Sequence, residues 1–248
     1  MIRVLKTIWA GISPPVSLLE TVGTGMRKNI SLTLAICFSA LFLTGAEWEL
    51  ITEEDGIKVM RKEVEGRSLP VFKGEGNVNE NLYEILGVLR DINKGKEWMH
   101  SCKESKLIKA IGDRKFIVYN VTNAPWPVSD RDVLVESEAT YDKASKTVTI
   151  IMNSIESPEV PKVDGLVRMP RLFGKFTLKS VKENVTFVTY EIDADPGGML
   201  PHWLVRMASK DIPYITLTNL RDRVKVMAAN GTYKKEVKLY REMGDNWN

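Results

Sequence analysis

The residues whose types and spacing could carry metal chemistry are few in this sequence. His100 and His202 are its two histidines, and His100-Ser101-Cys102 could place two ligands of a metal ion. Zinc sites need three or four protein ligands, and no further ligand cluster accompanies this tripeptide. We therefore expect no metal, and interpret His100 as a loop histidine and Cys102 as a small apolar side chain.

Sequence motifs of known catalytic or nucleotide-binding sites are also missing. The chain has no HExxH, CxxC, GxSxG or GxxxxGK[ST] pattern. Gly74-Glu75-Gly76 is a fragment inside a predicted strand rather than a dinucleotide fingerprint. Carboxylates are abundant, yet no pair is marked out by its spacing for acid–base work. Catalysis needs positioned groups, so we expect no catalytic residue and no cofactor.

Charge and composition are those of an ordinary globular protein. The 248 residues are 44% hydrophobic and 27% charged, with a formal net charge of +3. This charge comes from residues 1–46, because basic and acidic side chains balance from Glu47 onward. A neutral body with interspersed signs argues against nucleic-acid binding, which depends on phosphate neutralisation.

Residues 26–46 have the three parts of a secretory signal peptide. Met26-Arg27-Lys28 is basic, residues 30–43 are mostly apolar, and Thr44-Gly45-Ala46 supplies small residues for cleavage. The apolar run is shorter than the roughly 20 residues of a membrane-spanning helix; an uncleaved anchor or a buried helix are the alternatives. Residues 1–25 fit an over-extended start. We therefore expect a periplasmic or secreted protein that begins at Glu47.

Residues 47–230 are predicted to form one domain, with strands first and a long helix last. Helical spacing of apolar residues marks 82–89, with Asn79 as N-cap, and 200–229, ending at Asn230-Gly231. Residues 231–248 are interpreted as a loose charged tail. Alternating or apolar runs between turn residues predict strands at 57–64, 69–78, 106–111, 115–123, 132–141, 147–153, 167–181 and 185–194.

This order of elements predicts an α+β fold, with a mostly antiparallel sheet of about eight strands closed by one long amphipathic helix. Several strands carry apolar residues on both faces. In 185–194, Phe187 lies on one face while Val188, Tyr190 and Ile192 lie on the other. One apolar face must pack on something, and a sheet that curves around the helix can leave an apolar cavity between them.

Two stretches, residues 123–133 (NAPWPVSDRDV) and residues 186–204 with their TFVTY and DPGGMLPHWL blocks, together resemble the START (steroidogenic acute regulatory protein-related lipid transfer) domain family. Residues 123–133, NAPWPVSDRDV, are similar to its P-x-S-x-RD loop before a central strand. Residues 186–190 and 195–204 are similar to its T-x-V-T-Y and DPGG-x-LP-x-WL blocks before the last helix. Trp98, followed six residues later by Glu104, also fits. The family's tryptophan before the final hairpin is not clearly present, because residues 172–176 read LFGKF.

The resemblance spans residues 47–229 and implies a helix-grip fold, in which a curved antiparallel sheet wraps a long C-terminal helix and encloses an apolar cavity. It implies a monomeric, non-enzymatic protein that binds and transfers or senses a lipid or other hydrophobic small molecule, with transient membrane contact. A helix-grip enzyme of cyclase or hydrolase type is one alternative. An interaction module with a collapsed cavity is another.

The resemblance and the pattern together assign candidate residues to the cavity and its lid. Glu104 and Arg131 are expected to project inward and orient a ligand hydroxyl; alternatively, Arg131 ties its loop to a neighbouring aspartate or a strand-end carbonyl. Trp126 is either a membrane-facing or lid residue or a cap on the core. Pro196-Gly197-Gly198 is either a hinge or a static turn. The other expected wall residues are Tyr119, Met152, Phe173, Trp203, Leu204, Met207 and Ile215.

Overall fold

The computed structural model describes residues 47–67, 69–200 and 202–244, without the side chains of residues 202, 203, 205–210, 243 and 244. The predicted over-extended start and signal peptide lie outside the described residues. The elements in chain order are β1 (Glu49–Glu54), β2 (Ile57–Lys62), β3 (Val71–Val78), α1 (Leu82–Arg90), the 3₁₀ helix η1 (Ile92–Glu97), β4 (Cys102–Ile111), β5 (Lys115–Thr122), β6 (Arg131–Asp142), β7 (Thr147–Ser154), β8 (Val167–Arg168), β9 (Arg171–Lys182), β10 (Val185–Asp195), α2 (His202–Asn230) and α3 (Lys234–Gly244).

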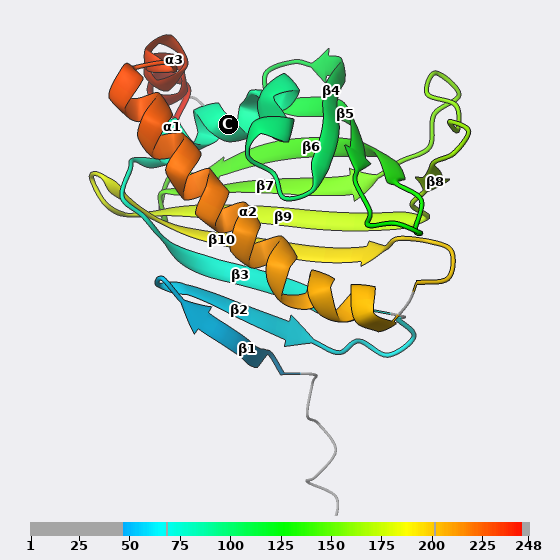
Figure 1. Ribbon diagram of the computed structural model, residues 1–248. Coiled ribbons are helices and arrows are strands. Elements are labelled where there is room, and N and C mark those ends of the chain that lie inside the picture. The colour runs from blue at the N-terminus through cyan, green and yellow to red at the C-terminus, as the bar shows by residue number, and fades with distance from the viewer. Residues whose placement is uncertain (1–46, 68, 201, 245–248) are drawn as a thin grey trace, which may run out of the picture. The chain divides into compact units, whose positions relative to one another are not determined.

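One curled antiparallel sheet forms the body of the domain. Its strand order is β1-β2-β3-β10-β9-β7-β6-β5-β4, and the short strand β8 pairs in parallel with β6. The long helix α2 crosses one face of this sheet diagonally (Figure 1). The helix-grip plan is therefore confirmed.

Helix α2 approaches the sheet closely over Gly74 of β3. A Cβ atom added to Gly74 would lie 2.9 Å from Cδ1 of Leu217 and 3.0 Å from Cβ of Pro213. A side chain at this position would push the helix off the sheet, since packed interiors leave no room for an extra methyl group. Because it has no side chain, Gly74 allows α2 to cross β3 at this point.

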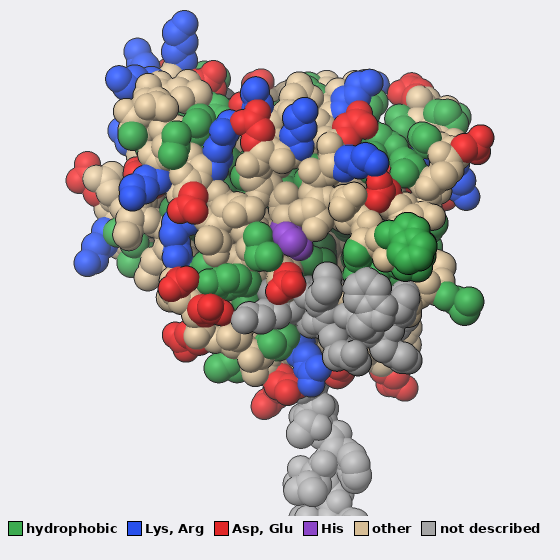
Figure 2. Space-filling model, in the orientation of Figure 1, with side chains coloured by type: hydrophobic (Ala, Val, Ile, Leu, Met, Phe, Trp, Pro, Cys, Tyr) green, Lys and Arg blue, Asp and Glu red, His purple; other side chains and the backbone are tan. Residues whose placement is uncertain are grey.

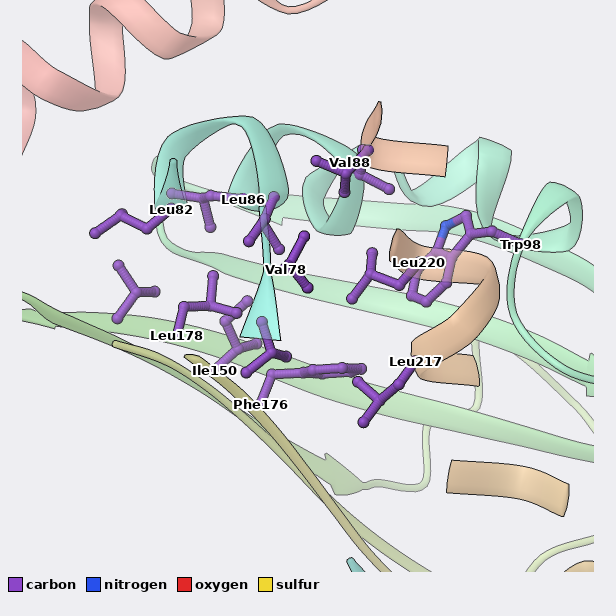
Figure 3. Packing of buried hydrophobic residues seen from close by; sticks show 14 of the residues in the cluster. Val78, Leu82, Leu86, Val88, Trp98, Ile150, Phe176, Leu178, Leu217 and Leu220 are labelled. Carbon is purple, nitrogen blue, oxygen red and sulfur yellow. The ribbon is translucent and has the colours of Figure 1, made fainter. Parts of the chain in front are cut away.

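The main core lies between the sheet, α1 and the second half of α2. Phe176 and Leu178 of β9 and Ile150 of β7 meet Leu217 and Leu220 of α2. Figure 3 shows these side chains converging, with residues of α1 above them and Trp98 beside Leu220. This core fixes α2 against the sheet along its second half.

The chain after Asn230 differs from the loose tail that we expected. It forms α3, which packs against α1, and its Val237 and Tyr240 are buried. The guanidinium of Arg90 at the end of α1 lies 4.8 Å from the ring centroid of Phe116 and 4.9 Å from that of Tyr240. The high charge of this segment hid the buried face, which holds few apolar residues.

Three local predictions are also corrected. Strand β1 was missed, because this edge strand is largely exposed and lacks an apolar alternation. The strand expected at 167–181 is divided into β8 and β9 around Pro170, which has no N–H for the ladder. The N-cap of α1 is Asn81 rather than Asn79: its Oδ1 accepts hydrogen bonds from the N–H groups of Tyr83 (3.1 Å) and Glu84 (3.2 Å).

Candidate ligand-binding cavity

A cavity of about 330 Å³ lies between the inner face of the sheet and α2. Its lining comes from β3 to β7, from β9 and β10, from α1 and η1, from the loop after β5 and from α2. The volume falls in the range of roughly 300–1,000 Å³ that is typical of small-molecule sites. The apolar cavity that was predicted from strands with apolar residues on both faces is therefore present.

Most of this lining is apolar and comes from β3, β7, β9, β10 and α2. The rings of Phe176 and Tyr190 stack there, with centroids 4.4 Å apart and planes inclined by 13°. Burial raises the pKa of Tyr190, so its hydroxyl stays protonated and neutral. The further apolar side chains of this wall are Phe72, Ile150, Met152, Leu172, Ile192, Leu204 and Ile212.

Strands β4, β5 and β6 add polar groups to the lining. Ser105 of β4 is the cross-strand partner of Asn120 on β5, and Thr122 of β5 is the partner of Arg131 on β6. All four side chains line the cavity, and cross-strand partners project from the same face of a sheet. We call these four residues the polar stripe.

Two buried polar atoms of the lining have no hydrogen-bond partner among the described residues. They are Nε1 of Trp98 and Oδ1 of Asn120, one a donor and the other an acceptor. A buried polar group without a partner costs free energy that a protein normally avoids. Both atoms are thus suited to a ligand that hydrogen-bonds inside the cavity.

The side chain of Arg131 is 7% exposed and bonds to backbone carbonyl oxygens. Its Nε and Nη2 donate to the oxygens of Pro196 and Gly197 at 3.4 Å each, and its Nη1 donates to that of Ser129. Burial lowers the pKa of Arg131, but a guanidinium remains charged at any physiological pH. Arg131 therefore links two loops at one end of the cavity, which we call its entrance, and adds a positive charge there.

The next residue, Asp132, faces away from the cavity and is 1% exposed. Its carboxylate accepts two hydrogen bonds from Arg168, at 3.0 and 2.8 Å, and one from the Tyr119 hydroxyl at 3.1 Å. Burial, together with this carboxylate, raises the pKa of Tyr119 to about 12. We call Tyr119, Asp132 and Arg168 the outer cluster. It ties β5 and β6 to β8 and so supports the wall that carries the polar stripe.

The two loops that Arg131 links, which we call the entrance loops, border this end of the cavity and expose large apolar side chains. Trp126, in the loop after β5, is 90% exposed, and Met199, in the loop before α2, is 98% exposed. Their chain neighbours Pro125 and Leu200 line the cavity. Elsewhere on the face shown in Figure 2, basic and acidic side chains are intermixed. The entrance thus combines apolar loop tips with a surface of mixed charge.

The segment Pro196-Gly197-Gly198 has a backbone conformation that glycine permits. Both glycines have φ of +66°, and the N–H of Gly197 donates to Oδ1 of Asp195 at 2.9 Å. Other residues adopt this left-handed region at a steric cost. A Cβ on Gly197 would also meet Pro170 at 3.0 Å, so the turn before α2 depends on these residues.

His100 and Cys102 are not brought together with further metal ligands. The described residues contain no cluster of three or more His, Cys, Asp or Glu side chains arranged to hold a metal. Burial lowers the pKa of His100, while the charge of Asp211 on α2 opposes the shift. Burial raises the pKa of Cys102 to about 11, and its thiol donates to the backbone oxygen of Glu104 at 3.3 Å.

The predicted site residues fall into four groups. Arg131, Met152, Leu204 and Pro196 line the cavity, whereas Glu104, Tyr119, Phe173 and Ile215 do not. Glu104 is exposed on β4, and Tyr119 faces the outer cluster. Gly197, Gly198 and Trp126 lie in the entrance loops. The side chains of Trp203 and Met207 lie outside the described residues.

Sequence reasoning missed the polar stripe apart from Arg131, and it also missed Phe176 and Tyr190 as wall residues. On β5 it selected Tyr119 instead of Asn120, because both faces of this strand carry apolar residues. The outer face is covered by partly buried residues of the segment after β7, among them Ile155, Val160 and Leu166. The alternation of one strand could not show which face points to the helix. The cross-strand pairing of Asn120 with Ser105, two polar residues on one face, was the available signal.

Comparisons with known proteins agree with this architecture. The START domain family model matches residues 36–226. An uncharacterized protein of Pseudomonas aeruginosa is 31% identical over 197 residues, covering 79% of this chain and 96% of that protein. The phosphatidylcholine transfer protein of Bos taurus is 29% identical over 197 residues, covering 78% of this chain and 88% of that protein.

Solved structures agree as well. The crystal structure of a fragment of the STAR-related lipid transfer protein from Xanthomonas axonopodis matches with a TM-score of 0.65 and 34% sequence identity. The match covers 72% of this chain and 98% of that one. Among the described helices, none combines the length and the apolar character needed to span a membrane. With most of its length matched by the family model, and with the sheet, helix and cavity described above, this chain belongs to the START domain family.

Proposed function

We propose that this protein binds one lipid or other hydrophobic small molecule in the cavity and carries or senses it without changing it chemically. The observation that supports this most strongly is the largely apolar cavity of about 330 Å³ beneath α2, in a chain of the START family. Removing on the order of 400 Å² of lipid surface from water is worth roughly 10 kcal/mol, before ordering and association costs are subtracted.

The similar proteins support a carrier. The bovine relative is named for the transfer of phosphatidylcholine, and the Xanthomonas relative for lipid transfer. A lipid crosses water slowly on its own, and a shell of mixed surface charge around an apolar interior removes that barrier. We propose a monomer that touches the membrane transiently through the entrance loops, where Trp126 and Met199 are exposed.

A cavity-filling variant tests the proposal directly. Ala194 lines the cavity, so Ala194→Trp is expected to occupy ligand space, whereas Val181→Trp places the same side chain at a surface position. After incubation with lipid vesicles and repurification, wild type and Val181→Trp should retain lipid by mass spectrometry, and Ala194→Trp should retain at least about tenfold less. Equal retention by both variants would contradict binding in this cavity.

The same experiment separates a carrier from an enzyme. A carrier releases the lipid with its mass unchanged, whereas a hydrolase or cyclase releases a product of altered mass or retention time. We expect the unchanged lipid, even after long incubation at a high ratio of lipid to protein. Accumulation of a product that depends on the folded protein would replace the carrier with the enzyme.

We also propose that the protein is exported and acts in the periplasm or outside the cell. The basic start, short apolar run and small-residue exit of residues 26–46 support this. Mass spectrometry of the protein from envelope and culture fractions should give an N-terminus at Glu47. A protein that keeps residues 26–46 and stays in the cytoplasmic fraction would contradict export.

A further inference from the structure

The polar stripe identifies a chemical class of ligand, and this inference rests on the proposed function. We propose that the ligand is an amphiphile whose headgroup carries a negative charge, on a carboxylate or phosphate, and that Arg131 pairs with this headgroup. In the part of the chain that the structure describes, the guanidinium is buried and bonds to three backbone carbonyl oxygens, but it forms no ion pair with a carboxylate. Carbonyl oxygens accept hydrogen bonds from three of its five N–H groups without neutralising its charge.

Among the described residues, the carboxylate whose charge acts on Arg131 is that of Asp130, and it is already engaged. Its Oδ2 lies 2.7 Å from Nζ of Lys103, and its Oδ1 accepts a hydrogen bond of 2.9 Å from the N–H of Ala124. Its charge acts on Arg131 at longer range, opposing the lowering of the pKa of Arg131 by burial. Because a buried charge is costly without a partner, the cavity side of Arg131 favours an anion.

Arg168 provides a comparison within the same pair of strands. It lies on the outer face of the sheet and holds the carboxylate of Asp132 through two hydrogen bonds, at 3.0 and 2.8 Å. The consecutive residues Arg131 and Asp132 therefore have opposite charges on opposite faces of β6. The outer charge has its partner within the chain, and the inner charge faces the ligand space.

The remaining charged or titratable groups of the described lining do not fill this role. Asp91 accepts a hydrogen bond from the Tyr233 hydroxyl at 3.0 Å. Asp211 acts on His100, between α2 and the start of β4. Neither carboxylate contributes to the pKa of Arg131. Within the described lining, the guanidinium of Arg131 is therefore not paired with Asp91 or Asp211.

Neighbouring donors and the direction of the strands complete the site. Thr122 is the cross-strand partner of Arg131, Asn120 is two residues further along the same face of β5, and Nε1 of Trp98 has no partner. Along the strands, Met152 and Phe176 lie progressively farther than Arg131 from the entrance end of the sheet. A headgroup at Arg131 therefore leaves the apolar wall to the hydrocarbon tail.

The test compares probes that differ in headgroup charge. Oleate, oleyl phosphate and methyl oleate have matched tails, and single-chain probes suit a cavity at the lower end of the small-molecule range. Their dissociation constants for the delipidated full chain are measured by calorimetry. Because a hydrogen bond to a charged group is much stronger than one between neutral groups, wild type should bind at least one anionic probe about tenfold or more tighter than methyl oleate.

Variants then assign this preference to Arg131. Arg131→Gln should abolish the preference, and Arg131→Lys should retain most of it because the charge remains. Lys106→Gln removes one positive charge from an exposed site next to Ser105 and should leave the preference as in wild type. If Arg131→Gln does not fold, Thr122→Val and Asn120→Leu should each weaken the anionic probes several-fold more than the ester.

The outcomes separate this inference from the proposed function. A stronger preference for oleyl phosphate assigns a phosphate headgroup, and one for oleate assigns a carboxylate. Tight binding of methyl oleate with no preference for either anion overturns the anionic ligand and leaves the carrier intact. A preference that survives Arg131→Gln also overturns the inference. Failure to bind any probe removes the proposed function together with it.

Discussion

Neighbouring residues on β5 and β6 differ in role because a strand points successive side chains to opposite faces. Arg131 faces the ligand space, while Asp132 binds Arg168 and Tyr119 on the outer face. Asn120 lines the cavity, while Tyr119 next to it supports the wall from outside. On β5, a change at Asn120 is therefore expected to affect ligand affinity, and a change at Tyr119 is expected to affect stability.

Tyr119→Phe tests this division. It removes the hydroxyl that donates to Asp132 at 3.1 Å, and a hydrogen bond to a charged group is worth about 1.5–3 kcal/mol. We expect a loss of that size in the free energy of unfolding by urea, with ligand affinity within about twofold of wild type. A large loss of affinity without loss of stability would return Tyr119 to the ligand site.

Cys102 should react slowly despite being a free thiol. Burial raises its pKa to about 11, and the thiolate is the reactive form. In the native protein, the rate at which Cys102 is alkylated should rise with pH up to about 11. In urea, the same rate should level off above about pH 8.5, the ordinary pKa of a thiol. Equal rates in both states at pH 8 would show that the thiol is not shielded.

At the scale of elements, α3 completes the domain by covering α1. Tyr233, the residue just before α3, packs closely on α1 at Gly87, where an added Cβ would lie 2.9 Å from Cγ and 3.0 Å from Cβ of Tyr233. The Tyr233 hydroxyl donates to Asp91 at 3.0 Å, so this ring cannot move away without losing a hydrogen bond. The position of α3 therefore depends on a glycine in the middle of α1.

The packing of Tyr233 on α1 is tested by whether Gly87→Ala raises or lowers the free energy of unfolding. Helix propensity alone would make it stabilising by about 1 kcal/mol. Because the new methyl group meets the Tyr233 ring, we expect destabilisation by about 1–3 kcal/mol instead, measured by urea unfolding. Gly87→Ala combined with Tyr233→Ala serves as the control, since the propensity gain should reappear against Tyr233→Ala alone. A stabilised single variant would show that α3 does not pack in this way.

The elements show which predictions from sequence succeed and which fail. The strands β2 to β7, β9 and β10 and the helix α2 follow, apart from their exact ends, from apolar periodicity and turn residues. This pattern supported an α+β plan, and the resemblance to the START family supplied its helix-grip arrangement. Strand β1 and helix α3 were missed, because an exposed edge strand and a charged helix have weak periodic signals. Within the site, the resemblance located the loop that contains Arg131, but the inward face of β5 required the pairing between strands.

At the scale of the whole molecule, we propose that a ligand passes between the membrane surface and the cavity along the entrance loops. The loop after β5 and the turn before α2 meet at Arg131, whose guanidinium bonds to the oxygens of Pro196 and Gly197. The apolar tips of these two segments, Trp126 and Met199, are almost fully exposed. Such tips are suited to the membrane interface, where tryptophan is enriched.

Transfer between vesicles tests this route. We expect Trp126→Ala and Met199→Ala each to slow transfer of a fluorescent lipid by about fivefold or more, since each loses part of an apolar side chain's burial in the membrane. Binding of the lipid in solution should remain close to wild type. Leu239→Ala, at an exposed position on α3, is the matched control and should transfer at the wild-type rate. If all three variants transfer the lipid at the wild-type rate, these loops do not contact the membrane.

The most direct test of the central claim is native mass spectrometry of the gently purified protein. The account predicts a main species with the mass of one chain plus one hydrophobic molecule, and release of that molecule intact on denaturation. A protein that is empty in every preparation, and that stays empty after incubation with vesicles of mixed lipids, would contradict it.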